Sequence, residues 1–72
     1  MRFFVTVDTN VYELLIDDSN AEIIGKIHND ANDLVYEFTS NDYADAKQIG
    51  LDFITNNYGT ITNIEEQEFD NP

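Results

Sequence analysis

The sequence has no cysteine among its 72 residues. Disulfides and thiolate-bound metal ions are therefore excluded, and neither can reinforce the fold. A chain of this length buries only about 60% of the surface that its unfolded form exposes, so its margin of stability is small. The lack of cysteine also fits a reducing compartment, and we expect a cytoplasmic protein.

Long hydrophobic runs are also lacking. No apolar stretch approaches the roughly 18 residues that a membrane-spanning helix needs, so we expect no membrane segment. Residues 2–7 already alternate like a strand, and we therefore expect no signal peptide.

Apolar material is nevertheless sufficient for one core. Hydrophobic residues make up 42% of the chain and include four tyrosines and five phenylalanines, which is too much for a disordered tail. We expect a single domain over residues 1–72, whose core contains Phe3, Val5, Val7, Tyr12, Leu14, Ile16, Tyr36, Phe38 and Phe53.

Positive charge is scarce. Fifteen Asp and Glu residues face only Arg2, Lys26 and Lys47, which gives a formal net charge of −12. This excess opposes binding to DNA, RNA or an anionic membrane and favours a basic partner. An ordinary acidic surface that keeps the protein in solution is the simpler alternative, and adaptation to high salt is a third.

Alternating apolar and polar residues predict most of the secondary structure. Turn-forming residues at 8–10 and 29–33 separate the alternating segments and suggest hairpins. A polar break is expected at residues 17–20. The segments themselves predict strands over residues 2–7, 11–17 and 34–39.

Residues 21–28 are ambiguous. Ser19 and Glu22 have the spacing of a capping box, which favours the start of a helix. Against this, Gly25 would cost a helix about 1 kcal/mol, and the isoleucines alternate with polar residues as in a strand. We favour the strand.

One long helix is predicted over about residues 41–58. Ser40 or Asn41 can cap it, and Asp42 and Asp45 suit its positive N-terminal end. Gly59 is expected to end it. At 100° per residue, one arc of this helix contains Tyr43, Ala46, Gly50, Phe53, Ile54 and Asn57.

A last strand is expected to start near residue 60 and run to residue 70, with residues 70–72 frayed. The chain is thus predicted to be a small α+β domain. It would have a mostly antiparallel sheet of four to five strands with the helix on one face. The expected order is β-β-β-β-α-β, with β-β-α-β-α-β as the fallback.

Catalytic residue types are nearly absent. There is one histidine, His28, and the serines Ser19 and Ser40 occupy turn or cap positions, so no activated nucleophile is expected. The three glycines are too far apart to cradle a phosphate. Residues 30–33 begin like a calcium loop but lack its glycine and terminal glutamate. We therefore expect no enzyme activity, metal site or cofactor.

The acidic side chains are the main candidates for binding a partner. Asp45 and Asp52 lie seven residues apart, hence about 10 Å apart on one side of the predicted helix. Carboxylates at such intervals can stand where phosphate oxygens would be. The candidates are Asp42, Asp45, Asp52, Glu65, Glu66 and Glu68, with Glu13 and Glu37 as an alternative on the sheet.

The sheet face away from the helix offers a second candidate surface. Its predicted apolar patch has an acidic rim, as protein-binding surfaces often do. Scattered apolar residues, or cover by the C-terminal segment through Phe69, are the alternatives, and so is a homodimer through this face. The patch consists of Phe4, Leu15, Ile24 and Val35.

In size, charge and lack of catalytic groups, the chain resembles the small acidic inhibitors of bacteriophages: anti-restriction proteins, anti-CRISPR proteins and inhibitors of uracil-DNA glycosylase. The resemblance is one of general character over the whole chain, without a shared motif, so it transfers no site residue. It implies a DNA mimic that competes for the basic channel of a nuclease or defence complex. A phage-encoded mimic would act in the cytoplasm of its bacterial host. The alternative function is a non-catalytic protein-interaction module that uses the apolar sheet face.

Overall fold

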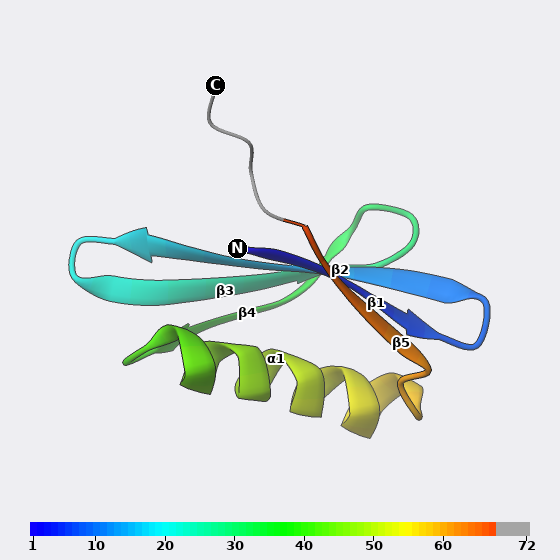
Figure 1. Cartoon of the computed structure of the whole chain (residues 1–72). Coiled ribbons are helices and arrows are strands. Elements are labelled where there is room, and N and C mark those ends of the chain that lie inside the picture. The colour runs from blue at the N-terminus through cyan, green and yellow to red at the C-terminus, as the bar shows by residue number, and fades with distance from the viewer. Residues whose placement is uncertain (68–72) are drawn as a thin grey trace.

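Four successive strands form three antiparallel hairpins before a helix begins (Figure 1). The computed structural model describes residues 1–67. Its element order, β-β-β-β-α-β, confirms the predicted order and fold class. The elements are β1 (Arg2–Val7), β2 (Asn10–Ser19), β3 (Glu22–His28), β4 (Leu34–Ser40), α1 (Tyr43–Tyr58) and β5 (Asn63–Gln67).

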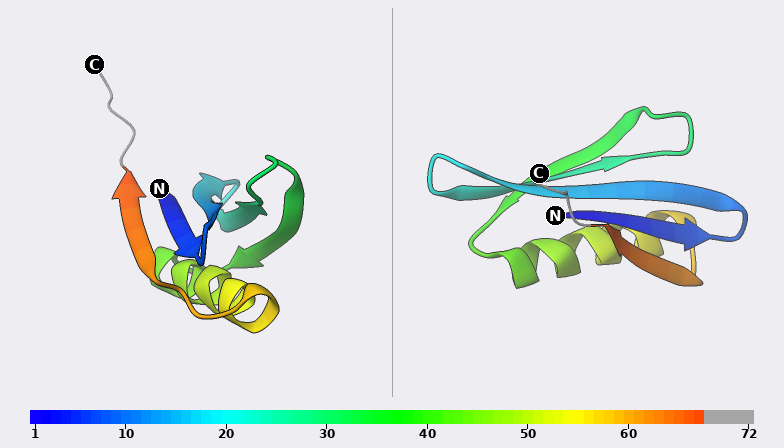
Figure 2. Two further views of the ribbon diagram at one scale, coloured as in Figure 1. Left: turned by 90° about the vertical axis from the view of Figure 1, so that its right-hand side faces the viewer. Right: turned by 45° about the horizontal axis from the view of Figure 1, so that its top comes forward.

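The strands form one five-stranded antiparallel sheet in the order β4-β3-β2-β1-β5. Helix α1 connects the edge strand β4 to the opposite edge strand β5, and it packs mainly on β3, with further contacts to β2 and β4. All of α1 therefore lies on one face of the sheet (Figures 1 and 2). Within residues 1–67 no helix is long and apolar enough to cross a membrane.

The core lies between the sheet and α1 because alternate strand residues point toward the helix. Six of the nine predicted core residues are buried, while Tyr36, Phe38 and Phe53 are only partly buried at the margin of the core. Tyr36 and Phe53 stack with ring centroids 4.1 Å apart. The buried apolar residues are Phe3, Val5, Val7, Tyr12, Leu14, Ile16, Ile23, Ile27, Ala46 and Ile54.

Residues 21–28 contain a strand, as favoured, and not a helix. Ser19 pairs with Glu22 across the β2–β3 hairpin, so these two residues do not form the alternative capping box. Gly25 leaves room for the ring of Phe38 on the adjacent strand, which would have to move if position 25 carried a Cβ atom.

The polar break predicted at residues 17–20 is too long. Asp17 and Asp18 remain in β2, where they pair with Ile24 and Ile23. The chain reverses at Asn20 and Ala21, whose φ angles of 51° and 65° are those of a tight two-residue hairpin turn. The hairpin consequently carries the two carboxylates to one end of the sheet.

The helix begins two residues later than predicted, and neither Ser40 nor Asn41 caps it. The N-cap is Asp42, whose carboxylate accepts a hydrogen bond of 2.7 Å from the backbone N–H of Asp45. Gly59, with φ 120°, ends the helix as predicted, and its N–H donates to the Thr55 carbonyl.

The last strand starts at Asn63, later than predicted. The Thr62 backbone N–H donates to the Thr6 carbonyl at 2.8 Å and leads the chain into pairing with β1. The predicted extension of this strand to residue 70, and the predicted fraying of residues 70–72, lie outside the described residues.

Candidate binding surfaces

The face of the sheet opposite α1 is called the open sheet face. Within residues 1–67 no helix covers it (Figures 1 and 2). Directly paired residues of antiparallel strands point to the same face, so the register assigns its side chains. One row across the sheet consists of Gln67, Arg2, Leu15, Lys26 and Glu37.

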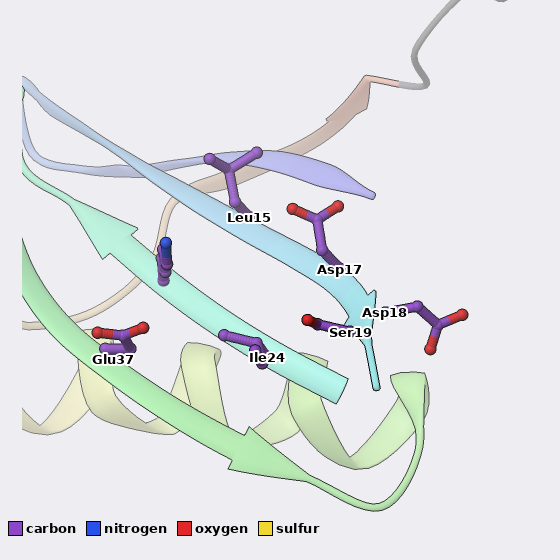
Figure 3. A pocket seen from close by; sticks show the side chains of 7 residues that line it. Leu15, Asp17, Asp18, Ser19, Ile24 and Glu37 are labelled. Atoms are coloured by element: carbon purple, nitrogen blue, oxygen red, sulfur yellow. The ribbon is translucent and has the colours of Figure 1, made fainter. Parts of the chain in front are cut away.

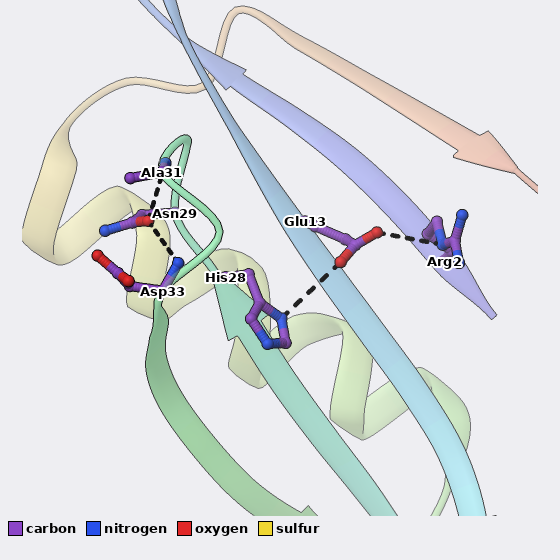
Figure 4. A network of polar contacts seen from close by, with 6 residues as sticks. All are labelled: Arg2, Glu13, His28, Asn29, Ala31 and Asp33. Atoms are coloured by element: carbon purple, nitrogen blue, oxygen red, sulfur yellow. Dashed lines mark hydrogen bonds and ion pairs between the residues drawn. The ribbon is translucent and has the colours of Figure 1, made fainter.

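A compact charge network occupies the centre of this face (Figure 4). Arg2 Nε lies 3.2 Å from Glu13 Oε2, and His28 Nδ1 lies 3.8 Å from Glu13 Oε1. The Glu13 side chain is only 24% exposed. Its negative charge is therefore compensated within the sheet, and Glu13 does not present a free carboxylate.

Glu37 is the second acidic candidate on this face. It lies on the edge strand β4 directly opposite Lys26 of β3. The open sheet face thus carries two of the three Lys and Arg residues of the chain, together with its only histidine, His28. This concentration of positive charge leaves few cations for the rest of the surface.

Three of the four residues of the predicted apolar patch, Phe4, Leu15 and Ile24, lie on the open sheet face by register and are partly buried. Val35 falls at the irregularity in the pairing of β3 with β4, and it packs against the core. A hollow of about 390 Å³ lies beside Leu15 and Ile24 (Figure 3). Its other lining residues are Asp17, Asp18, Ser19, Lys26 and Glu37.

A group of carboxylates surrounds the β2–β3 hairpin and the start of α1. We call it the acidic end. Ile23 of β3 pairs with Asp18 of β2 on one side and with Ser40 of β4 on the other. The β2–β3 hairpin therefore lies beside the segment that leads into α1. Glu22 and Asp45 line one surface hollow of about 260 Å³. The acidic end comprises Asp17, Asp18, Glu22, Asp42 and Asp45.

Hydrogen bonds hold part of the acidic end in place. The Ser40 hydroxyl donates to Asp45 Oδ2 at 2.5 Å, and Asp42 is fixed as the helix cap. Burial raises the pKa of Tyr43, and the negative charge of Asp18, a hydrogen bond with Asp18 and the charge of Asp17 raise it further. Tyr43 thus reports the negative potential at this end.

The remaining acidic candidates are dispersed. Asp52 lies further along α1, where it accepts a hydrogen bond of 2.8 Å from Gln48 Nε2. On β5, Glu65 pairs with Phe4 of the open face, whereas Glu66 pairs with Phe3 of the core-facing side. Glu68 and Phe69 lie outside the described residues.

Only two of the predicted acidic residues, Asp42 and Asp45, belong to the acidic end. Sequence analysis missed Asp17, Asp18 and Glu22, because it expected a polar break at residues 17–20 and did not place the flanking segments beside the helix start. The signal that could have found them is the Asn20–Ala21 position, since a two-residue turn there extends both strands.

The described surface shows neither a metal-binding group nor a catalytic pair. Within residues 1–67 no three His, Asp or Glu side chains are grouped as metal ligands. The Ser40 hydroxyl donates to a carboxylate, and His28 has Glu13 beside it, so the two residues do not form a nucleophile–base pair.

In comparisons with known proteins, no family model, curated protein or solved structure matches the chain. By its fold, the protein is a small α+β domain, and the described residues form an open sheet face and an acidic end.

Proposed function

We propose that the chain is a non-catalytic inhibitor that mimics nucleic acid and blocks a basic nucleic-acid-binding protein. One observation carries this proposal: five carboxylates gather at the acidic end, while the centre of the open sheet face holds Arg2, Lys26 and His28. Within residues 1–67 the ion pairs involve Glu13, and none involves a carboxylate of the acidic end.

The lack of ion pairs at the acidic end within residues 1–67 supports recognition of a cationic groove. A carboxylate without a cation nearby is available for charge-assisted hydrogen bonds from Arg or Lys of a partner. Asp52 adds a further negative charge along α1. The last turn of this helix contains no basic residue that would offset it. The partner would be a nuclease or defence complex of the kind that phage inhibitors block.

The mechanism is competition. The net charge of −12 attracts a basic protein over a distance and speeds encounter. Once docked, the acidic end occupies the positions that phosphates take in the channel, so nucleic acid is excluded. Because the interaction is largely electrostatic, added salt should weaken it, and cognate DNA or RNA should displace the inhibitor.

The test begins with a pull-down from the native host, which identifies the target. Binding of two quadruple variants is then compared. The first neutralises Asp17, Asp18, Asp45 and Asp52 to Asn, and leaves the helix cap Asp42 intact. The matched control neutralises four carboxylates elsewhere, with Asp8→Asn, Asp30→Asn, Asp33→Asn and Glu66→Gln.

Both variants have the same net charge, so they separate an organised surface from general acidity. We expect the first to lose inhibition while the control retains it. Equal losses would mean that only total charge matters, and capture of a target without basic residues in its binding site would also contradict the proposal.

The apolar open face supports a second candidate, a non-catalytic protein-interaction module. Its observation is the partly buried patch around Leu15 and Ile24 beside an open hollow. In this case aliphatic anchors carry the affinity and charge only steers. Leu15→Asp or Ile24→Asp would then abolish target binding, whereas the neutralised acidic end would be tolerated.

A further inference from the structure

The open sheet face combines three properties that the rest of the described surface lacks. It carries the partly buried apolar residues Phe4, Leu15 and Ile24, no helix of the described chain covers it, and it holds positive as well as negative side chains. Its middle rows place Arg2 and Lys26 beside Glu13 and Glu37, whereas its other carboxylates, Asp17, Glu22 and Glu65, lie nearer its margins. For a molecule with net charge −12, this is the face on which a second copy meets the least repulsion.

We propose that the open sheet face binds a second copy of this chain, so that the protein is a two-fold symmetric dimer of face-to-face sheets. This inference goes beyond the proposed function and does not depend on it.

The positions of the charges select one symmetry axis. A two-fold axis parallel to the strands and between β2 and β3 sets β1 of one copy over β4 of the other. Arg2 then faces Glu37 of the second copy, and Glu13 faces His28 of the second copy. An axis across the strands would instead set Arg2 over Arg2 and Glu37 over Glu37.

The apolar side chains fit the same axis. Phe4 of β1 lies in the row of Glu13 and His28, so it faces the start of β4, where Leu34 and Val35 lie. Leu15 faces the aliphatic stem of Lys26. The strand directions of two packed twisted sheets differ by about 30°. This rotation displaces the facing pairs by a few ångströms, and the displacement is smallest near the axis.

The overlapping area fits a reversible dimer. About this axis four strands of each copy overlap, and at about 4.8 Å apart and about 20 Å long they have a projected area of about 380 Å². The accessible area is larger because side chains project from the sheet. The contact therefore lies near the low end of what specific interfaces bury, roughly 600–800 Å² per partner.

In such a dimer the two helices point outward, and the acidic ends of the two copies lie at the same end of the assembly. Asp17 and Glu22 are on the open sheet face and lie at the margin of the interface, whereas Asp18, Asp42 and Asp45 stay available to another molecule.

The experiment is analytical ultracentrifugation of the full chain over a series of concentrations and salt. The dimer predicts a species of twice the 8.3 kDa chain mass. Salt should strengthen this dimer, since screening reduces the repulsion between two acidic chains; the Debye length falls from about 8 Å at 0.15 M to about 3 Å at 1 M. Target binding has the opposite salt dependence, so failures of the two proposals are distinguishable.

Leu15→Asp on the open face should raise the dimer dissociation constant at least about tenfold. The matched control is Ile64→Asp, which adds the same charge at a site that is 42% exposed and pairs with core-facing Val5. It should change the dissociation constant less than about twofold. Circular dichroism and urea titration check that both variants fold.

A charge exchange tests the axis itself. Arg2→Glu should weaken the dimer, and Arg2→Glu combined with Glu37→Arg should restore it, because the exchanged pair meets across the interface. If sedimentation gives the mass of a single chain at every protein and salt concentration, the proposal is overturned. It is also overturned by a dimer that tolerates Leu15→Asp, since the contact is then at an edge strand, or by a monomer that deletion of residues 68–72 converts into a dimer.

Discussion

Leu14 packs directly against Gly50, so closely that a Cβ atom at position 50 would lie 2.6 Å from Leu14 Cδ1. Leu14 is fully buried at the centre of the sheet, and Gly50 faces it from the middle of α1. The missing side chain therefore sets how closely the helix approaches β2 and fixes its position on the sheet.

Gly50→Ala tests this contact. Alanine favours a helix by about 1 kcal/mol over glycine, but overpacking a filled core costs about 1–3 kcal/mol. We expect a net loss of up to about 2 kcal/mol in the free energy of unfolding, measured by urea titration. Thr55→Ala, at an exposed position of the same helix, is the control and should change stability by less than about 0.5 kcal/mol.

The double variant Gly50→Ala with Leu14→Ala provides a second check. Leu14→Ala alone should cost about 2–5 kcal/mol, and adding Gly50→Ala should cost less than it does alone, because the overlap is gone. A gain in stability from Gly50→Ala in the otherwise unchanged chain would show that Leu14 moves aside freely.

Asp42 separates stability from charge at the acidic end. Its carboxylate caps α1, so Asp42→Ala should lower the free energy of unfolding by about 0.5–2 kcal/mol. Asp42→Asn keeps an oxygen acceptor and should retain most of that stability. Thermal unfolding of the two variants measures the difference, and equal losses would mean that the charge, and not the cap, stabilises the helix.

The strands and the helix were predictable because their patterns are local. Alternation in residues 2–7 and 34–39 reflects one buried and one open face of the sheet. The first residue of the helix was not predictable, because Ser40, Asn41 and Asp42 are all good N-cap residues. Ser40 pairs with Ile23, which keeps it in β4 and leaves the cap to Asp42.

The acidic end was less accessible to sequence analysis. Ala21 adopts a positive φ, which alanine rarely does, so Asn20 alone marks this hairpin turn and the signal is weak. Without that turn, Asp17 and Asp18 cannot be placed beside the helix start, since their proximity depends on register across three strands. Likewise, the pairing of Glu13 with Arg2 follows from the β1–β2 register and is invisible in a list of charges.

Two tyrosines should make stability depend on alkaline pH. Burial, followed by the effects of Tyr58 and Asp30, raises the pKa of Tyr12 above its ordinary 10.0, and the pKa of Tyr43 is also raised. The unfolded chain then loses these protons at lower pH than the folded chain. The free energy of unfolding should therefore fall as pH rises above 10.

Urea titrations at pH 8, 9, 10 and 11 measure this effect. Tyr12→Phe should reduce the loss above pH 10, because the hydroxyl that must stay protonated has been removed. Absorbance at 295 nm should show tyrosines that ionise above the ordinary range. Stability that is unchanged across this range would contradict the expectation.

The acidic end should weaken the fold because its carboxylates repel one another without compensating cations. Asp17→Asn removes one of these charges and should raise the free energy of unfolding by about 0.5 kcal/mol at low salt, as for other exposed charges. It should also lower the pKa of Tyr43, since Asp17 is one of the charges that raise it. Added salt should shrink the gain in stability.

Glu13→Gln is the matched control, because it removes the same charge from a carboxylate that lies 3.2 Å from Arg2. It should lower stability, or leave it unchanged, where Asp17→Asn raises it. Opposite signs for the two substitutions, measured by urea titration at 20 mM and 500 mM NaCl, would show that charge position and not net charge governs the fold. A destabilising group of carboxylates contributes nothing to folding, so this result would support the proposed role of the acidic end in binding a cationic partner.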